Sequence, residues 1–199
     1  GRSMSHGAPN LSINPRHTAL VIIDLQNDFL APDGAYARGG AVSAAAQALP
    51  PRVAAVAKAL KAAGGMVVGS QFTLWPDAQG EPMVSPHLKA LRPFLRRGDF
   101  APGSTGQAHV AEIAPWVDVS VCKVAYSAFF NTQLDWVLRR AGITTAAVCG
   151  IVTNGGVAST VRDAHMRDYQ TLVLSDGCAA FKQAAVSYTH LTLPTIYSV

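Results

Sequence analysis

Short apolar runs without alternation of polar and apolar residues recur along this chain, separated by segments with helical spacing. The first is Thr18-Ala-Leu-Val-Ile-Ile-Asp-Leu, and similar runs begin near Met66, Val117, Thr144 and Thr171. A strand has such a sequence when both faces of its sheet are covered, as in a parallel sheet. The alternation of strands and helices therefore predicts an α/β fold, with a parallel sheet between two layers of helices.

Helix signals occur between these runs. Pro51 suits the first turn of a helix that ends near Gly64, and apolar residues recur at helical spacing between them. Asn131 is the candidate N-cap of a second helix, which Gly142 ends.

The length of 199 residues predicts one domain, and the 49% hydrophobic and 14% charged content excludes a disordered or fibrous chain. No apolar run reaches the length of about 18 residues that a membrane helix needs. We expect a disordered lead-in over 1–15, the domain over 16–184, and an atypical or non-native tail over 185–199. The proline-rich stretch 73–115 is expected to be a long loop excursion that covers the site.

Charge and cysteine usage limit the partners and cofactors. The net charge is +4, with basic residues dense only at 92–97. A nucleic-acid binder would show a basic stripe, so we expect no nucleic-acid partner; a basic mouth for a small anionic substrate is the alternative. The three cysteines show no metal spacing and are expected to be buried, reduced thiols of a cytoplasmic protein: Cys122, Cys149 and Cys178.

Ligands of parallel α/β sheets bind at the carboxyl ends of the strands. Asp24 and Lys123 each stand at such an end. Burial would raise the pKa of Asp24 unless a partner opposes it, and Lys123 is a plausible partner. The alternative is that both residues only mark the exit of a strand to solvent.

The segment Gly150-Ile-Val-Thr-Asn-Gly-Gly-Val157 predicts a strand, a glycine-bearing turn and a helix. Small residues let backbone N–H groups approach a ligand, and a helix N-terminus favours negative charge. The spacing does not match a phosphate-binding GxGxxG or Walker loop.

Three segments, in this order, resemble the isochorismatase-like superfamily of cysteine hydrolases. They are Asp24-Leu-Gln-Asn-Asp-Phe29, Lys123-Val-Ala-Tyr-Ser-Ala-Phe, and Gly150-Ile-Val-Thr before a helix with Arg162-Asp-Ala. The resemblance covers about residues 17 to 181. It implies a three-layer α/β/α sandwich, Rossmann-like, with a mainly parallel six-stranded sheet.

The same resemblance implies roles for single residues. Asp24 matches the proton-transferring aspartate and Lys123 the catalytic lysine. The nucleophile position falls on Gly156, and a cis peptide bond falls at Ile151–Val152. The N–H groups of Val152 and Gly156 would then form an oxyanion hole.

Glycine at 156 has no side chain and cannot attack a carbonyl, and Cys149 is expected to be structural. The resemblance is therefore to members with glycine at this position, which hydrolyse the enol ether of isochorismate. The sequence departs from them at Val152-Thr-Asn. The nicotinamidase branch needs Asp and His after the second strand, and 71–76 has neither, so no metal is expected.

Four residues are candidates for substrate binding: Phe29, Trp75, Tyr126 and Asn154. For Tyr126, packing of the sheet edge is an equal alternative. No role is assigned to His87, His109 or His165.

The sequence thus predicts a small-molecule hydrolase that uses Asp24 and Lys123 for acid–base chemistry on an enol ether or related bond. It would need no cofactor and no covalent cysteine intermediate. Two alternatives are an amidohydrolase that uses water directly and a non-catalytic binding protein that has lost its nucleophile. We further expect a homo-oligomer with no membrane partner.

Overall fold

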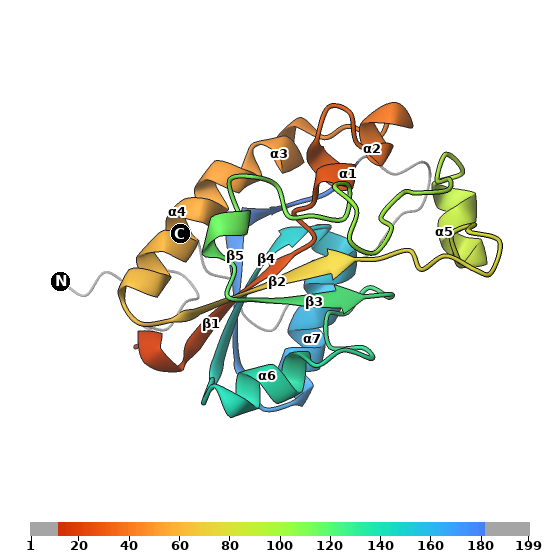
Figure 1. Ribbon diagram of the computed structural model, residues 1–199. Helices are drawn as coiled ribbons and strands as arrows, with labels where there is room; N and C mark the ends of the chain where they lie inside the picture. Colours follow the sequence, from red (N-terminus) through yellow and green to blue (C-terminus); the bar gives the residue numbers. More distant parts are fainter. Residues whose placement is uncertain (1–11, 182–199) are drawn as a thin grey trace.

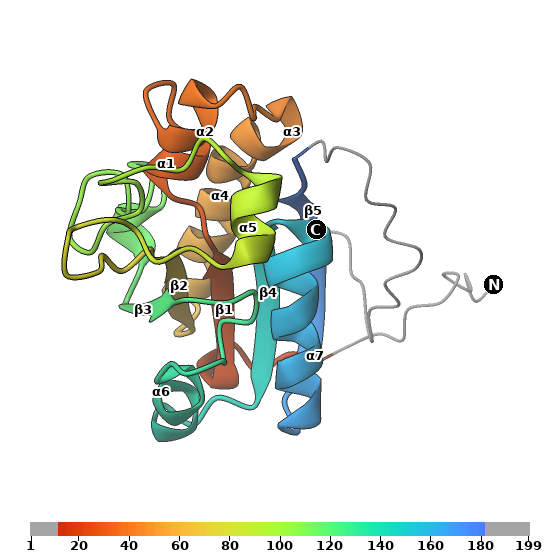
Figure 2. The same ribbon diagram turned by 90° about the vertical axis from the view of Figure 1, so that its right-hand side faces the viewer.

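The computed structural model describes residues 12–181, which form one parallel sheet with helices on both faces (Figures 1 and 2). Its five strands lie in the order β3-β2-β1-β4-β5, and every neighbouring pair is parallel. The strands are β1 (Thr18–Ile23), β2 (Met66–Phe72), β3 (Val119–Lys123), β4 (Thr145–Ile151) and β5 (Gln170–Ala179). The predicted α/β/α sandwich is confirmed. The expected sixth strand is not among the described residues.

The helical elements connect these strands in chain order. They are η1 (Pro15–His17), α1 (Asn27–Leu30), α2 (Ala35–Arg38), α3 (Ala44–Gln47), α4 (Leu49–Ala62), α5 (Pro86–Leu91), η2 (Ala114–Trp116), α6 (Leu134–Arg140), η3 (Thr153–Val157) and α7 (Ala158–Met166). The helix predicted between Pro51 and Gly64 is α4, and Gly64 follows it with φ +95°. No helix among the described residues is long and apolar enough to cross a membrane.

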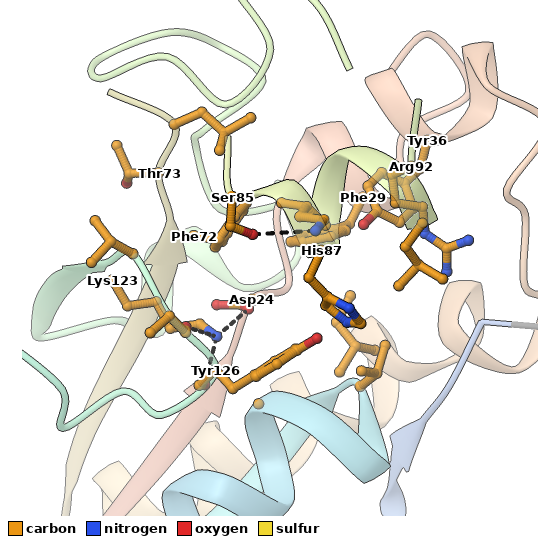
Figure 3. A pocket seen from close by; sticks show the side chains of 18 of the residues that line it. Asp24, Phe29, Tyr36, Phe72, Thr73, Ser85, His87, Arg92, Lys123 and Tyr126 are labelled. Atoms are coloured by element: carbon orange, nitrogen blue, oxygen red, sulfur yellow. Dashed lines mark hydrogen bonds and ion pairs between the residues drawn. The ribbon is translucent and has the colours of Figure 1, made fainter. Parts of the chain in front are cut away.

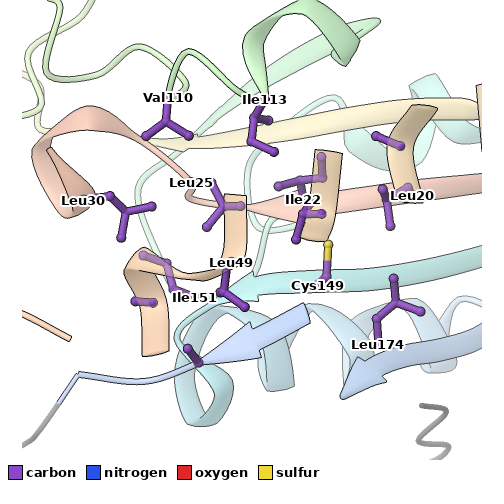
Figure 4. Packing of buried hydrophobic residues seen from close by; sticks show 14 of the residues in the cluster. Leu20, Ile22, Leu25, Leu30, Leu49, Val110, Ile113, Cys149, Ile151 and Leu174 are labelled. Atoms are coloured by element: carbon purple, nitrogen blue, oxygen red, sulfur yellow. The ribbon is translucent and has the colours of Figure 1, made fainter. Parts of the chain in front are cut away.

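The central strand β1 explains the continuous apolar run that the sequence shows. Leu20 and Ile22 point to one core, which lies under α4, and Val21 and Ile23 point to the other, which lies under α6 and α7 (Figure 4 shows the first). All six residues of β1 are buried. From Ala19 to Ile23 the strand is entirely apolar, as expected of a strand covered on both faces, and the next residue, Asp24, carries a polar side chain at its end.

Two sequence expectations about local structure are wrong. Asn131 is not the N-cap of α6: it takes φ +52°, which asparagine tolerates, and the Oγ1 of Thr132 accepts the N–H of Leu134 at 3.1 Å instead. Cys122 is exposed, because β3 is the outermost described strand on its side of the sheet and one of its faces is uncovered.

The lead-in and tail boundaries remain predictions, since residues 1–11 and 182–199 lie outside the described residues. Within the described part, Asn14 caps η1: its Oδ1 accepts the backbone N–H of Arg16 at 3.1 Å.

The Asp24–Phe29 segment ties the sheet to the excursion over 73–115. Gln26 is fully buried and binds the backbone of β2 at Phe72 twice: Oε1 accepts its N–H at 2.7 Å, and Nε2 donates to its carbonyl at 2.9 Å. The same Nε2 donates to the carbonyl of Gln107 at 2.9 Å. Asp28 accepts the backbone N–H groups of Ala35 and Phe100, at 3.0 and 2.8 Å. These bonds fix the excursion beside the end of β1.

Gln26→Met should lower the free energy of unfolding by about 2–4 kcal/mol, because it leaves buried backbone groups of Phe72 and Gln107 unpaired. Urea denaturation measures the change. Gln133→Met, at an exposed glutamine, is the matched control and should stay within about 0.5 kcal/mol of wild type. Equal stability of the two variants would show that the clamp contributes nothing.

Candidate active site

The carboxyl ends of β1 and β3 bring Asp24 and Lys123 together. Lys123 Nζ lies 2.8 Å from Asp24 Oδ2, and the residues are 2% and 5% exposed. The predicted pairing of these two side chains is therefore confirmed as geometry. Since β2 lies between β1 and β3, the pair spans three strands.

The middle strand supplies a residue that the sequence reading missed. Ser70 on β2 is fully buried; its Oγ donates to Asp24 Oδ1 at 2.7 Å and accepts the backbone N–H of Asp24 at 3.2 Å. Asp24 itself has φ +58°, an uncommon conformation for a residue with a side chain. Ser70 lies opposite Ile23, the residue before Asp24, in the pairing of β1 with β2. The sequence could therefore have pointed to Ser70 only once the order of the strands was known.

Lys123 is held by more than the carboxylate. Its Nζ also donates to the carbonyl oxygens of Ala125 and Tyr126, at 3.1 and 2.8 Å (Figure 3). It further lies 5.9 Å from the centroid of the Phe72 ring. Three acceptors therefore fix the ammonium group at one point.

Burial raises the pKa of Asp24 above the ordinary value of 3.8, and the attraction of Lys123 and the hydrogen bonds from Lys123 and Ser70 oppose this in part. A carboxyl group with a raised pKa holds a proton more readily at neutral pH. It can then donate that proton to a bound molecule.

The turn after β4 lies beside this pair. The peptide bond Ile151–Val152 is cis, as the resemblance implies. A Cβ atom added to Gly156 would lie 3.1 Å from Lys123 Nζ and 2.9 Å from Ile23 Cγ2. Gly150, with φ +114°, packs so closely on β1 that a Cβ there would lie 2.1 Å from the carbonyl oxygen of Ile23. The glycines thus let the turn approach the ion pair.

A cavity of about 530 Å³ opens over these groups (Figure 3). Of the predicted residues it is lined by Asp24, Lys123, Val152, Gly156, Phe29, Trp75 and Tyr126. Trp75 and Tyr126 are about half exposed, so they lie at the rim. Asn154 is exposed and does not line the cavity, because η3 turns its side chain away.

The excursion contributes lining residues that the sequence reading did not assign. They include Tyr36 from α2, together with Ser85, His87 and Arg92 around α5. His87 therefore faces the site, although no role was assigned to it. The dense basic segment 92–97 was the one signal in the sequence, and of its three arginines only Arg92 lines the cavity.

The cysteines lie apart from the cavity lining. Cys149 is fully buried in the core under α4, and burial raises its pKa well above the ordinary value. Burial also raises the pKa of Cys178 to about 11. Within residues 12–181, no group of three His, Cys, Asp or Glu side chains could hold a metal ion.

The parallel sheet and the site at its edge are those of an enzyme with an α/β/α sandwich fold, and comparison with known proteins gives the family. Residues 18–193 match the model of the isochorismatase domain. The chain belongs to the isochorismatase family of small-molecule hydrolases.

Two curated relatives are named ureidoacrylate amidohydrolase RutB. The protein of Azorhizobium caulinodans is 34% identical over 95% of this chain and 86% of its own length. That of Caulobacter vibrioides is 34% identical over 83% of this chain and 78% of its own length.

Solved structures agree in fold. A cysteine hydrolase from Pseudomonas syringae superposes with a TM-score of 0.76, at 30% identity over 94% of this chain and 83% of its own. N-carbamoylsarcosine amidase from Thermoplasma acidophilum superposes with a TM-score of 0.65, at 27% identity over 82% and 84%.

The raised pKa of Asp24 predicts a pH dependence of stability. The folded state binds this proton more tightly than the unfolded chain. The resulting stabilisation is present below pH 3.8, the ordinary value, and is lost as pH rises through the folded pKa. Wild type should therefore lose stability relative to Asp24→Asn as the pH rises above about 4, by up to about 1.4 kcal/mol per pH unit.

Urea denaturation at several pH values measures this difference. Asp33→Asn, at an exposed carboxylate, reports the effect of removing one surface charge. If wild type instead gains stability over Asp24→Asn as pH rises, the attraction of Lys123 outweighs burial and the raised pKa is wrong.

Proposed function

We propose that the protein hydrolyses a small molecule by direct attack of water, without a covalent bond between substrate and enzyme. The observation that carries this proposal is the place of Gly156. It lines the cavity, and the Cβ that it lacks would lie 3.1 Å from Lys123 Nζ. No nucleophilic side chain therefore stands beside the ion pair at this position, and water that enters the cavity is the nucleophile that remains.

In this proposal Asp24 transfers the proton. For an enol ether, the Asp24 carboxyl protonates the double-bond carbon that does not carry the ether oxygen, and water adds to the resulting oxocarbenium ion while returning one proton to Asp24. The hydroxyl proton of this adduct then passes to the ether oxygen as the C–O bond breaks, which gives a carbonyl compound and an alcohol, so the cycle balances. The raised pKa of Asp24 supports this role, because the group must be protonated when substrate binds.

Lys123 and the turn after β4 would stabilise negative charge during the reaction. Lys123 orients Asp24 through the 2.8 Å contact and holds its conjugate base after proton transfer. The N–H groups of Val152 and Gly156 would stabilise negative charge that develops on an oxygen of the substrate. Phe29, Trp75 and Tyr126 would enclose the apolar part of the molecule.

Hydrolysis of an amide or ureido C–N bond is the second candidate, and the names of the relatives favour it. Here water would attack the carbonyl carbon, Asp24 would take the proton of that water, and the proton would pass to the leaving nitrogen as the C–N bond breaks. The same residues serve both reactions. A binding protein without activity is the remaining alternative.

We further propose a cytoplasmic homo-oligomer that binds neither nucleic acid nor membranes. Large exposed apolar side chains support self-association: Phe130, Trp136 and Met166 are 52%, 66% and 69% exposed. The native mass in solution tests the association.

A panel of small enol ethers and ureido or amide compounds tests the function. Wild type should turn over one class, and Asp24→Asn should lower kcat by about 10²–10⁴-fold, because proton transfer is lost. Asp33→Asn should keep wild-type activity. No turnover of either class would leave a binding protein.

Intact-protein mass during turnover tests the absence of a covalent intermediate. No adduct should form on wild type, and Cys122→Ser removes the exposed thiol as a source of side reactions. A stable adduct on Cys149 would overturn the mechanism.

Gly156→Cys should create a reactive thiol, because Lys123 favours the thiolate. With p-nitrophenyl acetate in the Cys122→Ser background, this variant should form an acyl adduct. Gly155→Cys is the matched control: its Cβ is equally crowded, 2.9 Å from Val152 Cγ2, but Lys123 is not among its near neighbours. Both should lose about 1–3 kcal/mol of stability from overpacking. Equal reactivity of the two thiols would contradict the placement of position 156 at the reacting centre.

A further inference from the structure

Arg92 is a buried cation that lines the cavity. It follows α5, and its backbone N–H donates to the carbonyl of Leu88 at 2.7 Å. The residue is only 8% exposed, and its guanidinium carbon lies 5.3 Å from the centroid of the Tyr36 ring. In Figure 3, Arg92 and Tyr36 lie across the cavity from Lys123.

The guanidinium of Arg92 is not fully satisfied by the protein. Its Nε is buried and has no hydrogen-bond partner among the described residues. Four other arginines of the described residues pair with carboxylates: Arg38 with Asp99, Arg97 with Glu81, Arg139 with Asp135 and Arg167 with Asp163. No such ion pair with Arg92 exists between residues 12 and 181.

No acidic side chain outside the described residues can supply the missing partner. The chain has 12 Asp and Glu residues, and all of them lie between Asp24 and Asp176. A buried charge without a partner is costly, and a buried donor without an acceptor adds to that cost. An anion that enters the cavity and binds Arg92 would remove the cost of the unpaired charge and the cost of the unpaired Nε–H donor.

The two cations of the cavity stand at opposite ends of a row of aromatic rings. From Arg92 the row runs through Tyr36, Phe29 and Phe72 to Lys123, and the ring centroids are 4.7 Å apart for Phe29–Tyr36 and 6.1 Å apart for Phe29–Phe72. Lys123 is partnered by the protein, through Asp24 and two backbone carbonyl oxygens. Arg92 has no carboxylate within ion-pair distance among the described residues.

From these contacts we infer that Arg92 forms a subsite for a carboxylate group of the substrate. The substrate is a small, largely apolar or planar acid. Its carboxylate binds Arg92, its body lies along Phe29 and Tyr36, and its reacting bond lies at Asp24 and Lys123. The guanidinium lies over the Tyr36 ring, and its buried Nε–H, which has no acceptor among the described residues, can donate to an oxygen of a bound carboxylate. This inference deepens the proposed function and rests on it for the reacting end.

Benzoate and benzamide, which share a shape but not a charge, are the probes. Wild type should bind benzoate, as measured by calorimetry, and bind benzamide more weakly. Arg92→Met should weaken benzoate binding by roughly 10–100-fold, as expected for lost hydrogen bonds to a charged group, and leave benzamide unchanged. Arg92→Lys should fall between, and Arg96→Met, at an exposed arginine, should match wild type.

A measurement on wild type keeps the test decisive if Arg92→Met does not fold. The Nε–H resonance of Arg92, identified by its loss in Arg92→Lys, should shift as benzoate is added and not as benzamide is added. Equal benzoate binding by wild type and Arg92→Met, an unmoved Arg92 resonance, or no binding of benzoate by wild type would each overturn the subsite.

The outcome is separable from that of the proposed function. Asp24→Asn, which should be inactive, should still bind benzoate through Arg92. If no compound is hydrolysed but benzoate binding still requires Arg92, then the proposed function fails and the carboxylate subsite stands. Once a substrate is known, Arg92→Met should raise KM far more than it lowers kcat.

Discussion

The buried ion pair between Asp24 and Lys123 is the interaction around which this molecule is arranged. Two opposite charges can leave water only if each finds partners, and here three strands provide them. Strand β1 ends in the carboxylate, β3 ends in the lysine, and β2 between them supplies Ser70 to the carboxylate. The backbone after β3 supplies two carbonyl acceptors to the ammonium group.

The glycines of the turn after β4 allow the backbone to lie close to this ion pair. Gly150 allows the contact of β4 with the carbonyl of Ile23, and Gly156 brings the start of the following helix to Lys123 Nζ. Because position 156 carries no side chain, the proposed mechanism leaves the attack to water and the transfer of a proton to Asp24. The raised pKa of this group suits that role.

The excursion over 73–115 covers one side of the cavity. Gln26 and Asp28, in the segment directly after β1, bind its backbone, so the residues that hold the excursion and the proposed proton donor Asp24 come from one short stretch of sequence. That attachment places α5 and Arg92 over the open side of the cavity. In the proposed function, binding and proton transfer are carried by different segments, which are fixed to each other by hydrogen bonds to the backbone.

The sequence by itself determined the parallel sheet, the helix from Leu49 to Ala62 and the location of Asp24 and Lys123 at strand ends, because these depend on local periodicity and on a topological rule. Family motifs located the turn at Gly156. Only the tertiary structure decided that Ser70 binds Asp24, that Arg92 lines the cavity while Arg96 and Arg97 do not, that Asn154 is exposed outside the cavity, and that Cys122 is exposed. Each of these depends on which strands are neighbours and on how a long loop folds over them. Such contacts join residues far apart in the chain, and local spacing carries no information about them.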